Sequence, residues 1–495
     1  MNIDNSIFNL KILLLILLDS FIILPDSFSQ VKNEQGNAKY DNCELSQKEL
    51  QTIIDGGLAF LEFSQIKETL GIKQFAGEWP SYINLNKRIP FFDCDRYYDS
   101  NAFAVIPIHN ILAEIFLDFP EYDRIPFMLQ KSIKHILNFK TDSSFTFGFW
   151  PYLSKVQKSE FTNNKLNNFL IRKPNHFPLR TYFSKNFVNV VDDADDHALA
   201  IQAIYYFNKI AELTNLDKID VNLNYSVTNI FDNYRDINRK NIFIFDRYKS
   251  KLENSGAYLT WFGSESEFKS TNSIDYFCNN LFWFLPYSHL YTRSNTAHIP
   301  FSTNNVDIIV NLNIISSLAY LNMLDSLDGL NDALKMINKI VINNNYDNAS
   351  SYYPNRYQLH YSISKAYIAC NKKFLNAEVF QLISHLKSTQ NRDGSWSDKK
   401  SGNKEDIVQS TANALMALIN FGDFEANDSL ENINKAISFL HKQMKTEGNK
   451  KYWKGGTFYC GGIYLKNLLW WNSDSYTTAL IIQALVKYEN IFFYK

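Results

Sequence analysis

Directly after an amphipathic segment at 375–390, the sequence reads Gln390-Asn391-Arg392-Asp393-Gly394-Ser395-Trp396. A glutamine amide can satisfy backbone groups left open at a helix end, and a glycine permits the tight turn that follows. The tryptophan supplies a large apolar surface that covers the joint. We therefore expect this stretch to tie the end of one surface helix to the next pair of helices.

The same combination of residues recurs elsewhere in the chain. Gln65 precedes Gly77 and Trp79, and a weaker copy places Gln443 before Trp453. A joint that recurs indicates a fold assembled from similar helical units.

Segments with apolar residues at three- and four-residue spacing lie between these joints and predict two kinds of helix. Amphipathic segments, which bury one stripe and expose the other, lie at 45–65, 126–140, 217–234, 328–344, 375–390 and 429–446. Segments that are apolar or small on nearly every side, and therefore buried all round, lie at 99–117, 193–211, 306–322, 357–370, 408–421 and 474–488. We find no convincing pair of strands between them.

The two kinds of segment alternate strictly, amphipathic then buried, six times. A ring of six helical hairpins, with buried helices inside and amphipathic helices outside, satisfies both patterns at once. The sequence thus predicts an all-α fold, a single (α/α)6 toroid with an inner and an outer ring over residues 45–495.

Composition excludes some classes of partner. The chain has 50 Lys plus Arg against 51 Asp plus Glu, so nothing favours a polyanion, and we expect no nucleic-acid partner. With 39 Phe and 29 Tyr, it is well supplied for a large core or an aromatic-lined cavity. The five cysteines are widely scattered and show no Cys/His metal spacing, so we predict no metal site.

The N-terminal segment has features of an export signal. Lys11 precedes an apolar run that Asp19 interrupts, and small residues at Ser27 and Ser29 fit a cleavage site. An uncleaved membrane anchor is the alternative, although Asp19 would then lie near its middle. We predict a signal peptide or N-terminal anchor at 1–29, a linker at 30–44, and export to the periplasm or the cell exterior.

Four acids lie within five residues at the start of the second buried segment: Asp192, Asp193, Asp195 and Asp196. At the mouth of an apolar ring they cannot all ionise at low cost, so at least one should stay protonated. A protonated carboxyl that faces an apolar pocket is a proton donor. The alternative is that they cap the helix and complement its dipole, which needs only one or two acids.

Two motifs resemble those of a known superfamily. The stretch 390–396 resembles the QW motif of squalene-hopene cyclases, and the cluster 193–196 is similar to the DxDD motif of class II terpene cyclases. The resemblance places the chain among the α/α toroids of the terpenoid cyclases and protein prenyltransferases. It implies that Asp195 protonates an alkene or epoxide of an apolar isoprenoid, while Asp193 and Asp196 hold Asp195 in its reactive geometry. No cofactor is implied.

The chain departs from these families in three respects. His197 stands where the cyclase pattern usually has Thr, and we expect it to tune protonation of the acids. Full class II cyclases join two helical domains, whereas one ring is expected here. The sequence does not match the zinc-ligand pattern of the prenyltransferases, since Thr477 occupies a position that would need one of those ligands. Peripheral membrane contact would suit an isoprenoid substrate.

Two rival functions remain open. Secreted carbohydrate-active enzymes also use six-hairpin toroids, and Asp193 or Asp195 could then pair with Asp307 as acid and base on a glycan. Aromatic platforms for that substrate would be Trp261, Trp283 and Tyr291. A non-catalytic binding or scaffold protein is the second rival.

Several further residues are candidates for the substrate cavity. The stretch 235–305 is too long for a hairpin loop, and we expect either a lid over the ring mouth or an extra buried hairpin. Asp307 and Asn311 lie one turn apart on one face, so both could point into the hollow. Asp474, which opens the last buried segment, is a candidate for the rim.

Overall fold

The computed structural model divides the chain into Met1–Asn42 and Cys43–Lys495. It describes residues 45–493 except 72, 86–95, 142–144, 153–171, 173–189, 222, 224, 239–253, 264–303, 399–403, 423–428 and 462–468. The predicted signal peptide and linker therefore lie outside the described residues. No helix of the described part is long and apolar enough to cross a membrane.

A helix lies in each of the twelve predicted segments. The amphipathic segments hold α2 (Gln47–Ser64), α4 (Ile125–Ile136), α9 (Tyr225–Asn233), α12 (Leu330–Ile342), α14 (Asn376–Thr389) and α16 (Leu430–Gln443). The buried segments hold α3 (Ala102–Asp118), α8 (Ala194–Thr214), α11 (Ile308–Tyr320), α13 (Arg356–Ala369), α15 (Lys404–Phe421) and α17 (Asp474–Phe493).

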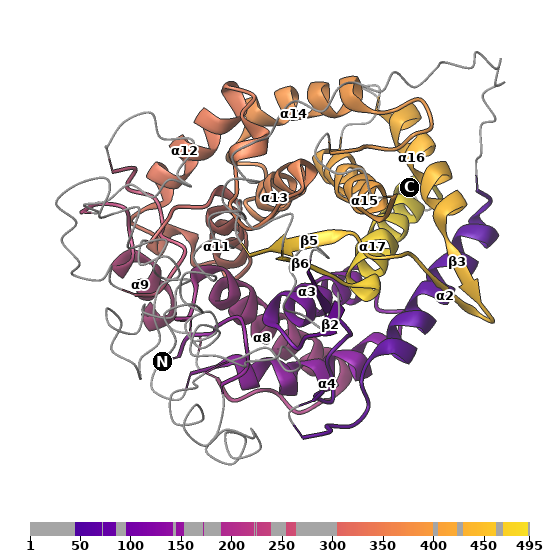
Figure 1. Cartoon of the computed structure of the whole chain (residues 1–495), viewed down its shortest axis with the longest axis horizontal. Coiled ribbons are helices and arrows are strands. Elements are labelled where there is room, and N and C mark those ends of the chain that lie inside the picture. The colour runs from indigo at the N-terminus through magenta and orange to yellow at the C-terminus, as the bar shows by residue number, and fades with distance from the viewer. Residues whose placement is uncertain are drawn as a thin grey trace, which may run out of the picture. The chain divides into compact units, whose positions relative to one another are not determined.

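The six buried helices contact one another in a closed cycle. The order is α3, α8, α11, α13, α15, α17 and back to α3 (Figure 1). Outside this cycle α2 packs on α17, α4 on α3 and α8, α12 on α11, α14 on α13 and α15, and α16 on α15. The buried helices expose no polar stripe because each has neighbours on several sides.

Hydrogen bonds between neighbouring buried helices show that they run parallel. Near the helix starts, Asn355 donates to Ser410 at 2.7 Å. Near the helix ends, Asn420 donates to Ser364 at 3.1 Å and accepts from Lys487 at 3.1 Å. Starts thus meet starts and ends meet ends, so the N-terminal caps of neighbouring helices gather on one side.

In two of the three copies of the joint, the glutamine ties two outer helices together. The Gln390 amide, at the end of α14, donates to the carbonyl of Gly394 at 3.0 Å and to that of Asn432 in α16 at 2.8 Å. The Gln65 amide, at the end of α2, donates to Gly77 at 3.0 Å and to Met128 in α4 at 2.9 Å. The expected joint is present in both copies.

The tryptophans of the joints cap the preceding outer helices. The indole N–H of Trp396 donates to the carbonyl of Leu386 at 2.9 Å, and that of Trp453 donates to Leu440 at 2.7 Å. These are carbonyls near helix C-termini, which lack a partner within the helix. The rings are buried, so each joint adds both a hydrogen bond and apolar area.

The expectation that strands are absent was wrong. Four short strands form an antiparallel sheet in the order β2 (Arg96–Tyr98), β1 (Tyr82–Leu85), β6 (Leu469–Asn472), β5 (Thr457–Cys460). A separate hairpin joins β3 (Lys445–Glu447) to β4 (Lys450–Tyr452). Ile83 pairs with Trp471, far away in the chain. Strands of three or four residues carry too little alternation to be found locally.

Part of the long stretch 235–305 is buried between the starts of two inner helices. Ala257 and Tyr258 are fully buried, Trp261 forms a bridge with Asp193, and Leu259 forms one with Val306. The described residues 254–263 are therefore an internal connection between α8 and α11. The rest of the stretch, 239–253 and 264–303, lies outside the described residues, so the expected lid or extra hairpin over 235–305 stays a prediction.

A substitution at Gly394 would test how closely the repeated joint packs. Its φ is +89°, and a Cβ placed there would lie 2.1 Å from the Lys435 carbonyl oxygen. Gly394→Ala should therefore lower the free energy of unfolding by about 2–4 kcal/mol, because it combines backbone strain with a backbone clash. Urea unfolding followed by far-UV circular dichroism measures this loss.

Gly448→Ala is the matched control, since its φ is +62° and no atom lies within 4 Å of the new Cβ. It should lose only the cost of the left-handed backbone, about 1 kcal/mol. Equal losses at the two positions would contradict the close packing of the joint.

Candidate active site

The four clustered acids have different surroundings, and Asp192 is the one that is neutralised. Its carboxylate forms an ion pair with Arg172, and it accepts hydrogen bonds from Thr141 and Thr146 at 2.5 Å each. The Arg172 side chain is only 2% exposed and also donates to the Trp150 carbonyl. Asp192 thus belongs to a structural ion pair beside the site.

Asp193 is the N-terminal cap of α8, as expected if the clustered acids cap the helix. Its Oδ1 accepts from the backbone N–H of Asp196 at 2.7 Å. Burial raises the pKa of Asp193 to about 6, and the hydrogen bonds from Asp196 act against that rise. Asp193 therefore accounts for the helix cap, and capping does not explain why Asp195 and Asp196 are acidic.

Asp196 is buried beside Asp193 without a donor of its own. Only 1% of the residue is exposed, and among the described residues no donor reaches either carboxyl oxygen. Burial, and then the adjacent carboxyl of Asp193, raise the pKa of Asp196 well above its usual range. Two carboxyls this close cannot both ionise at low cost, so the pair retains a proton at neutral pH.

Asp195 is held by two side chains from other elements. Tyr353 donates its hydroxyl proton to Oδ2 at 2.5 Å, and the amide of Asn313 in α11 donates to Oδ1 at 2.7 Å. The residue is 2% exposed. Burial raises the pKa of Asp195 to about 7, the two hydrogen bonds lower it, and the charge of Asp193 raises it. Asp195 caps nothing and is poised to exchange a proton near neutral pH.

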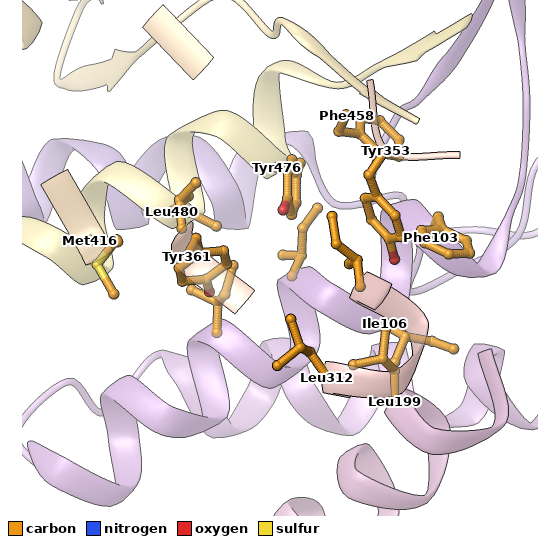
Figure 2. Close-up of a cluster of buried hydrophobic side chains, with 14 of the residues drawn as sticks. Phe103, Ile106, Leu199, Leu312, Tyr353, Tyr361, Met416, Phe458, Tyr476 and Leu480 are labelled. Carbon is orange, nitrogen blue, oxygen red and sulfur yellow. The ribbon is translucent and has the colours of Figure 1, made fainter. Parts of the chain in front are cut away.

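An aromatic cluster adjoins Tyr353. The rings of Phe103 and Tyr353 lie 5.5 Å apart (Figure 2), and Phe103 stacks on Tyr459 at 4.6 Å. Tyr459 in turn stacks on Phe149 at 5.0 Å and meets Trp471 edge-on at 5.2 Å. The π faces of such rings stabilise positive charge. We call Phe103, Phe149, Tyr353, Tyr459 and Trp471 the aromatic wall.

The sheet that the sequence did not predict supplies part of this wall. Tyr459 lies on β5 and Trp471 on β6. The Trp471 indole donates to the buried carboxylate of Asp99 at 2.8 Å, and the Trp150 indole donates to it at 3.2 Å. These bonds fix the orientation of the Trp471 ring, while burial raises the pKa of Asp99 to about 6.

His197 lies apart from the acids, in an aromatic box. The imidazole is 5.3 Å from the Phe231 ring and 6.0 Å from the Phe147 ring. Its Nε2 is 3.4 Å from the Val227 carbonyl, and none of its hydrogen bonds within the described part of the chain goes to an acid. Burial lowers its pKa to about 4, so the ring is neutral at pH 7. The imidazole hydrogen-bonds no acid among the described residues, and its expected tuning role stays a prediction.

Asp307 is a helix cap whose oxygens are occupied. Oδ1 accepts from the backbone N–H groups of Ile309 and Val310 at 2.9 and 3.3 Å. Oδ2 accepts from Ser350 at 2.6 Å and from the Ser351 N–H at 2.8 Å. Asp307 therefore shapes the start of α11 and the turn before α13, and it has little capacity left to act as a base.

Asn311 likewise serves the backbone. Its amide exchanges two hydrogen bonds of 3.0 Å with the backbone of Tyr258, and it also donates to the Asp307 carbonyl. Trp261 is buried near the acids, with its indole donating to the Tyr352 hydroxyl at 3.1 Å. Of these two candidates, Trp261 is the one whose backbone bridges Asp193.

Asp474 is a partly exposed residue at the start of α17. It pairs with Lys454 at 2.9 Å and accepts from the Gly455 N–H at 2.8 Å. Trp283 and Tyr291 fall outside the described residues. Within the part that the structure describes, no three His, Cys, Asp or Glu side chains are grouped to hold a metal ion.

Tyr353 and Tyr459 are among the residues of the site that were missed as candidates, and Asn313 was noted only as a buried polar residue that needs a partner. Asn313 carried a signal, since it is a polar residue inside an apolar segment. Tyr353 follows Ser350-Ser351 just before the buried segment 357–370, which is a weak signal. Nothing local marks Tyr459, because its place depends on the pairing of β5 with β6.

Comparison with known proteins relates this geometry to a fold. No protein-family model and no curated protein matches the sequence. Among solved structures, a variant of the type II terpene cyclase MstE from Scytonema, in complex with its substrate geranylgeranyl dihydroxybenzoate, is 12% identical over 89% of this chain and 97% of that chain, with a TM-score of 0.50. The apo form of MstE is 13% identical over 90% of this chain and all of its own, with a TM-score of 0.48. The chain has a terpene cyclase-like fold.

Proposed function

We propose that the chain is a class II-like terpenoid cyclase, in which Asp195 starts cyclisation of an isoprenoid by protonating an alkene or epoxide. Its architecture would be a single (α/α)6 toroid, as the closed cycle of inner helices suggests. Asp193 and Asp196 position Asp195 and keep the negative charge around it low.

The observation that carries this proposal is the setting of Asp195. The carboxyl is buried, its pKa is near 7, and it lies against Tyr353 beside the aromatic wall. An acid that is about half protonated at neutral pH and faces apolar surroundings can give its proton to a carbon–carbon double bond.

The two donors to Asp195 support the same step. When the O–H proton moves to the substrate, the carboxyl becomes a carboxylate, and a carbocation forms on the substrate. Tyr353 and Asn313 stabilise that carboxylate, since hydrogen bonds to the charged form favour it. The wall faces the cation until a neighbouring carbon gives a proton to solvent water, and the Asp195 carboxylate takes up a proton from solvent before the next turnover. This division of labour needs no cofactor.

The rival glycan function has less support. It needs Asp307 as a base, and that carboxylate already accepts four hydrogen bonds. We further propose export through residues 1–29 and peripheral membrane contact, which would bring the enzyme to a membrane-dissolved isoprenoid.

Asp195→Asn should abolish cyclisation of a prenylated substrate. Positioned acids contribute about 10²–10⁴-fold to rate, and the amide cannot replace the acid. Incubation with geranylgeranylated arenes and polyprenes, followed by mass spectrometry of the products, measures the loss. Asp307→Asn is the matched control, a buried cap on the neighbouring helix, and should stay within about tenfold of wild type. Equal loss of cyclisation in both variants would contradict a role specific to Asp195.

The rate should fall with rising pH as Asp195 ionises. With a pKa near 7, kcat/KM should decline above about pH 7. Tyr353→Phe removes a hydrogen bond that favours the ionised form, so the falling limb should move up by about one pH unit. Tyr352→Phe is the control, because that hydroxyl contacts Trp261 and Asn305 instead. A limb that stays in place in Tyr353→Phe would contradict the role of this hydroxyl.

Stability should also report the proton on Asp195. A carboxyl whose pKa is raised by folding stabilises the fold fully below about pH 4, and this contribution is lost as the pH rises through about 7. Asp195→Asn should therefore gain stability relative to wild type between pH 4.5 and 8, by up to about 3 kcal/mol. Urea unfolding at both pH values measures the gain. Ser317→Ala, which carries no titratable group, should shift stability equally at both; an equally flat result for Asp195→Asn would contradict the raised pKa.

A further inference from the structure

The inward faces of the inner helices carry residues in repeated 4-3-4 spacing. In α17 the residue Thr478 turns outward to the backbone of Trp453, so the stripe on the opposite face turns inward. That stripe reads Tyr476, Leu480, Gln483 and Lys487. The corresponding stripe of α8 reads Asp195, Leu199, Gln202 and Tyr206. Each stripe starts at the end of the ring that holds Asp195, continues with a leucine, and finishes with two polar residues.

Along the ring axis, the layer of side chains that follows Asp195 is apolar. Figure 2 labels residues of this layer that together come from all six inner helices: Ile106, Leu199, Leu312, Tyr361, Met416 and Leu480. All are buried. An isoprenoid chain would find an apolar surface here, below Asp195.

Beyond this layer, polar side chains from four inner helices meet around Glu114. Gln483 donates to its carboxylate at 2.6 Å, and Gln202 and Tyr206 donate at 3.4 Å each. The Lys365 ammonium lies 4.0 Å away. We call Glu114, Gln202, Tyr206, Lys365 and Gln483 the polar floor. Gln202 is seven residues from Asp195 in α8, about 10 Å along the helix axis.

The ion pair of the floor crosses the ring. Glu114 belongs to α3 and Lys365 to α13, and these helices are not neighbours in the cycle. Both side chains are only 12% exposed. The Glu114–Lys365 pair therefore spans the centre of the ring with one negative and one positive charge. The Oε1 atom of the buried Gln483 accepts from no donor among the described residues, so an acceptor remains open in the floor.

We propose that the polar floor binds the head group of the substrate, and that this head is an uncharged hydroxyl-bearing group instead of a diphosphate. This inference rests on the proposed function, because it takes the acid end of the ring as the site of protonation. A hydroxyl can donate to Gln483 or Glu114 and accept from Lys365. The substrate is then an amphipathic prenyl alcohol or phenol with its tail at Asp195 and its polar end at Glu114.

Charge balance argues against an anionic head. A diphosphate would bring several negative charges beside the Glu114 carboxylate, and Lys365 is already matched. Two further charged residues, Lys487 and Asp118, line a cavity of about 410 Å³. Their charges are opposite, so they leave the balance of charge at the polar floor unchanged. An uncharged head leaves the buried pair intact.

Binding to the full chain tests this proposal without turnover. In the Asp195→Asn background, tryptophan fluorescence titration compares geranylgeraniol with geranylgeranyl diphosphate, which share one tail. The alcohol should bind at least about tenfold more tightly, because the diphosphate leaves unmatched charge in the floor. Adding Glu114→Gln should reduce this ratio and adding Lys365→Met should widen it, each by about fivefold or more. A purely structural role would weaken both ligands alike.

The doubly substituted floor, Glu114→Gln with Lys365→Met, is neutral again and keeps the test open if either single change prevents folding. Because the two single effects oppose each other, it should keep the ratio within about threefold of its value in the Asp195→Asn background. Tighter binding of the diphosphate, or a ratio unmoved by either single substitution, would overturn the floor and leave the cyclase proposal standing. Selective alcohol binding without any turnover by the wild type would support the floor and overturn the cyclase. Failure of both ligands to bind would overturn both.

Discussion

The closure of the six buried helices on one another is the constraint from which the site follows. Because neighbouring inner helices run parallel, their N-terminal caps gather on one side of the ring. Asp193 and Asp307 satisfy backbone N–H groups there, and Asp195 and Asn313 follow within the first turns. Acids that would be ordinary at one exposed helix start are thereby buried together.

The electrostatics of the acid cluster balance two opposing effects. Burial disfavours each carboxylate, and hydrogen bonds from Tyr353 and Asn313 favour the ionised form of Asp195. An acid with burial alone would hold its proton too tightly, and one with donors alone would lose it in water. The pKa of Asp195 near 7 is the result of both, while Asp196, which has no donor among the described residues, keeps its proton more firmly.

The interior changes character along the ring axis. Acids and aromatic rings lie at one end, an apolar layer follows, and the polar floor around Glu114 lies at the other end. Each layer draws on helices that are far apart in the chain, so its composition depends on how the ring closes. The short sheet completes the acid end by carrying Tyr459 and Trp471 to the wall.

The sequence by itself determined the helices, the joints between them and the acid cluster. Hydrophobic periodicity, caps and glycine turns act between residues a few positions apart, so they can be read locally, as Gln390, Gly394 and Trp396 demonstrate. The acid cluster was visible because its members are adjacent.

Only the tertiary structure decided which acid is held, by what, and which candidates are structural. Tyr353 reaches Asp195 across 158 positions and Asn313 across 118, and Tyr82 pairs with Asn472 in the sheet. His197 and Asp307 looked like partners of the acids, yet one packs among phenylalanines and the other caps α11. Periodicity specifies that a face is buried, but the residue opposite it is set by how the ring closes.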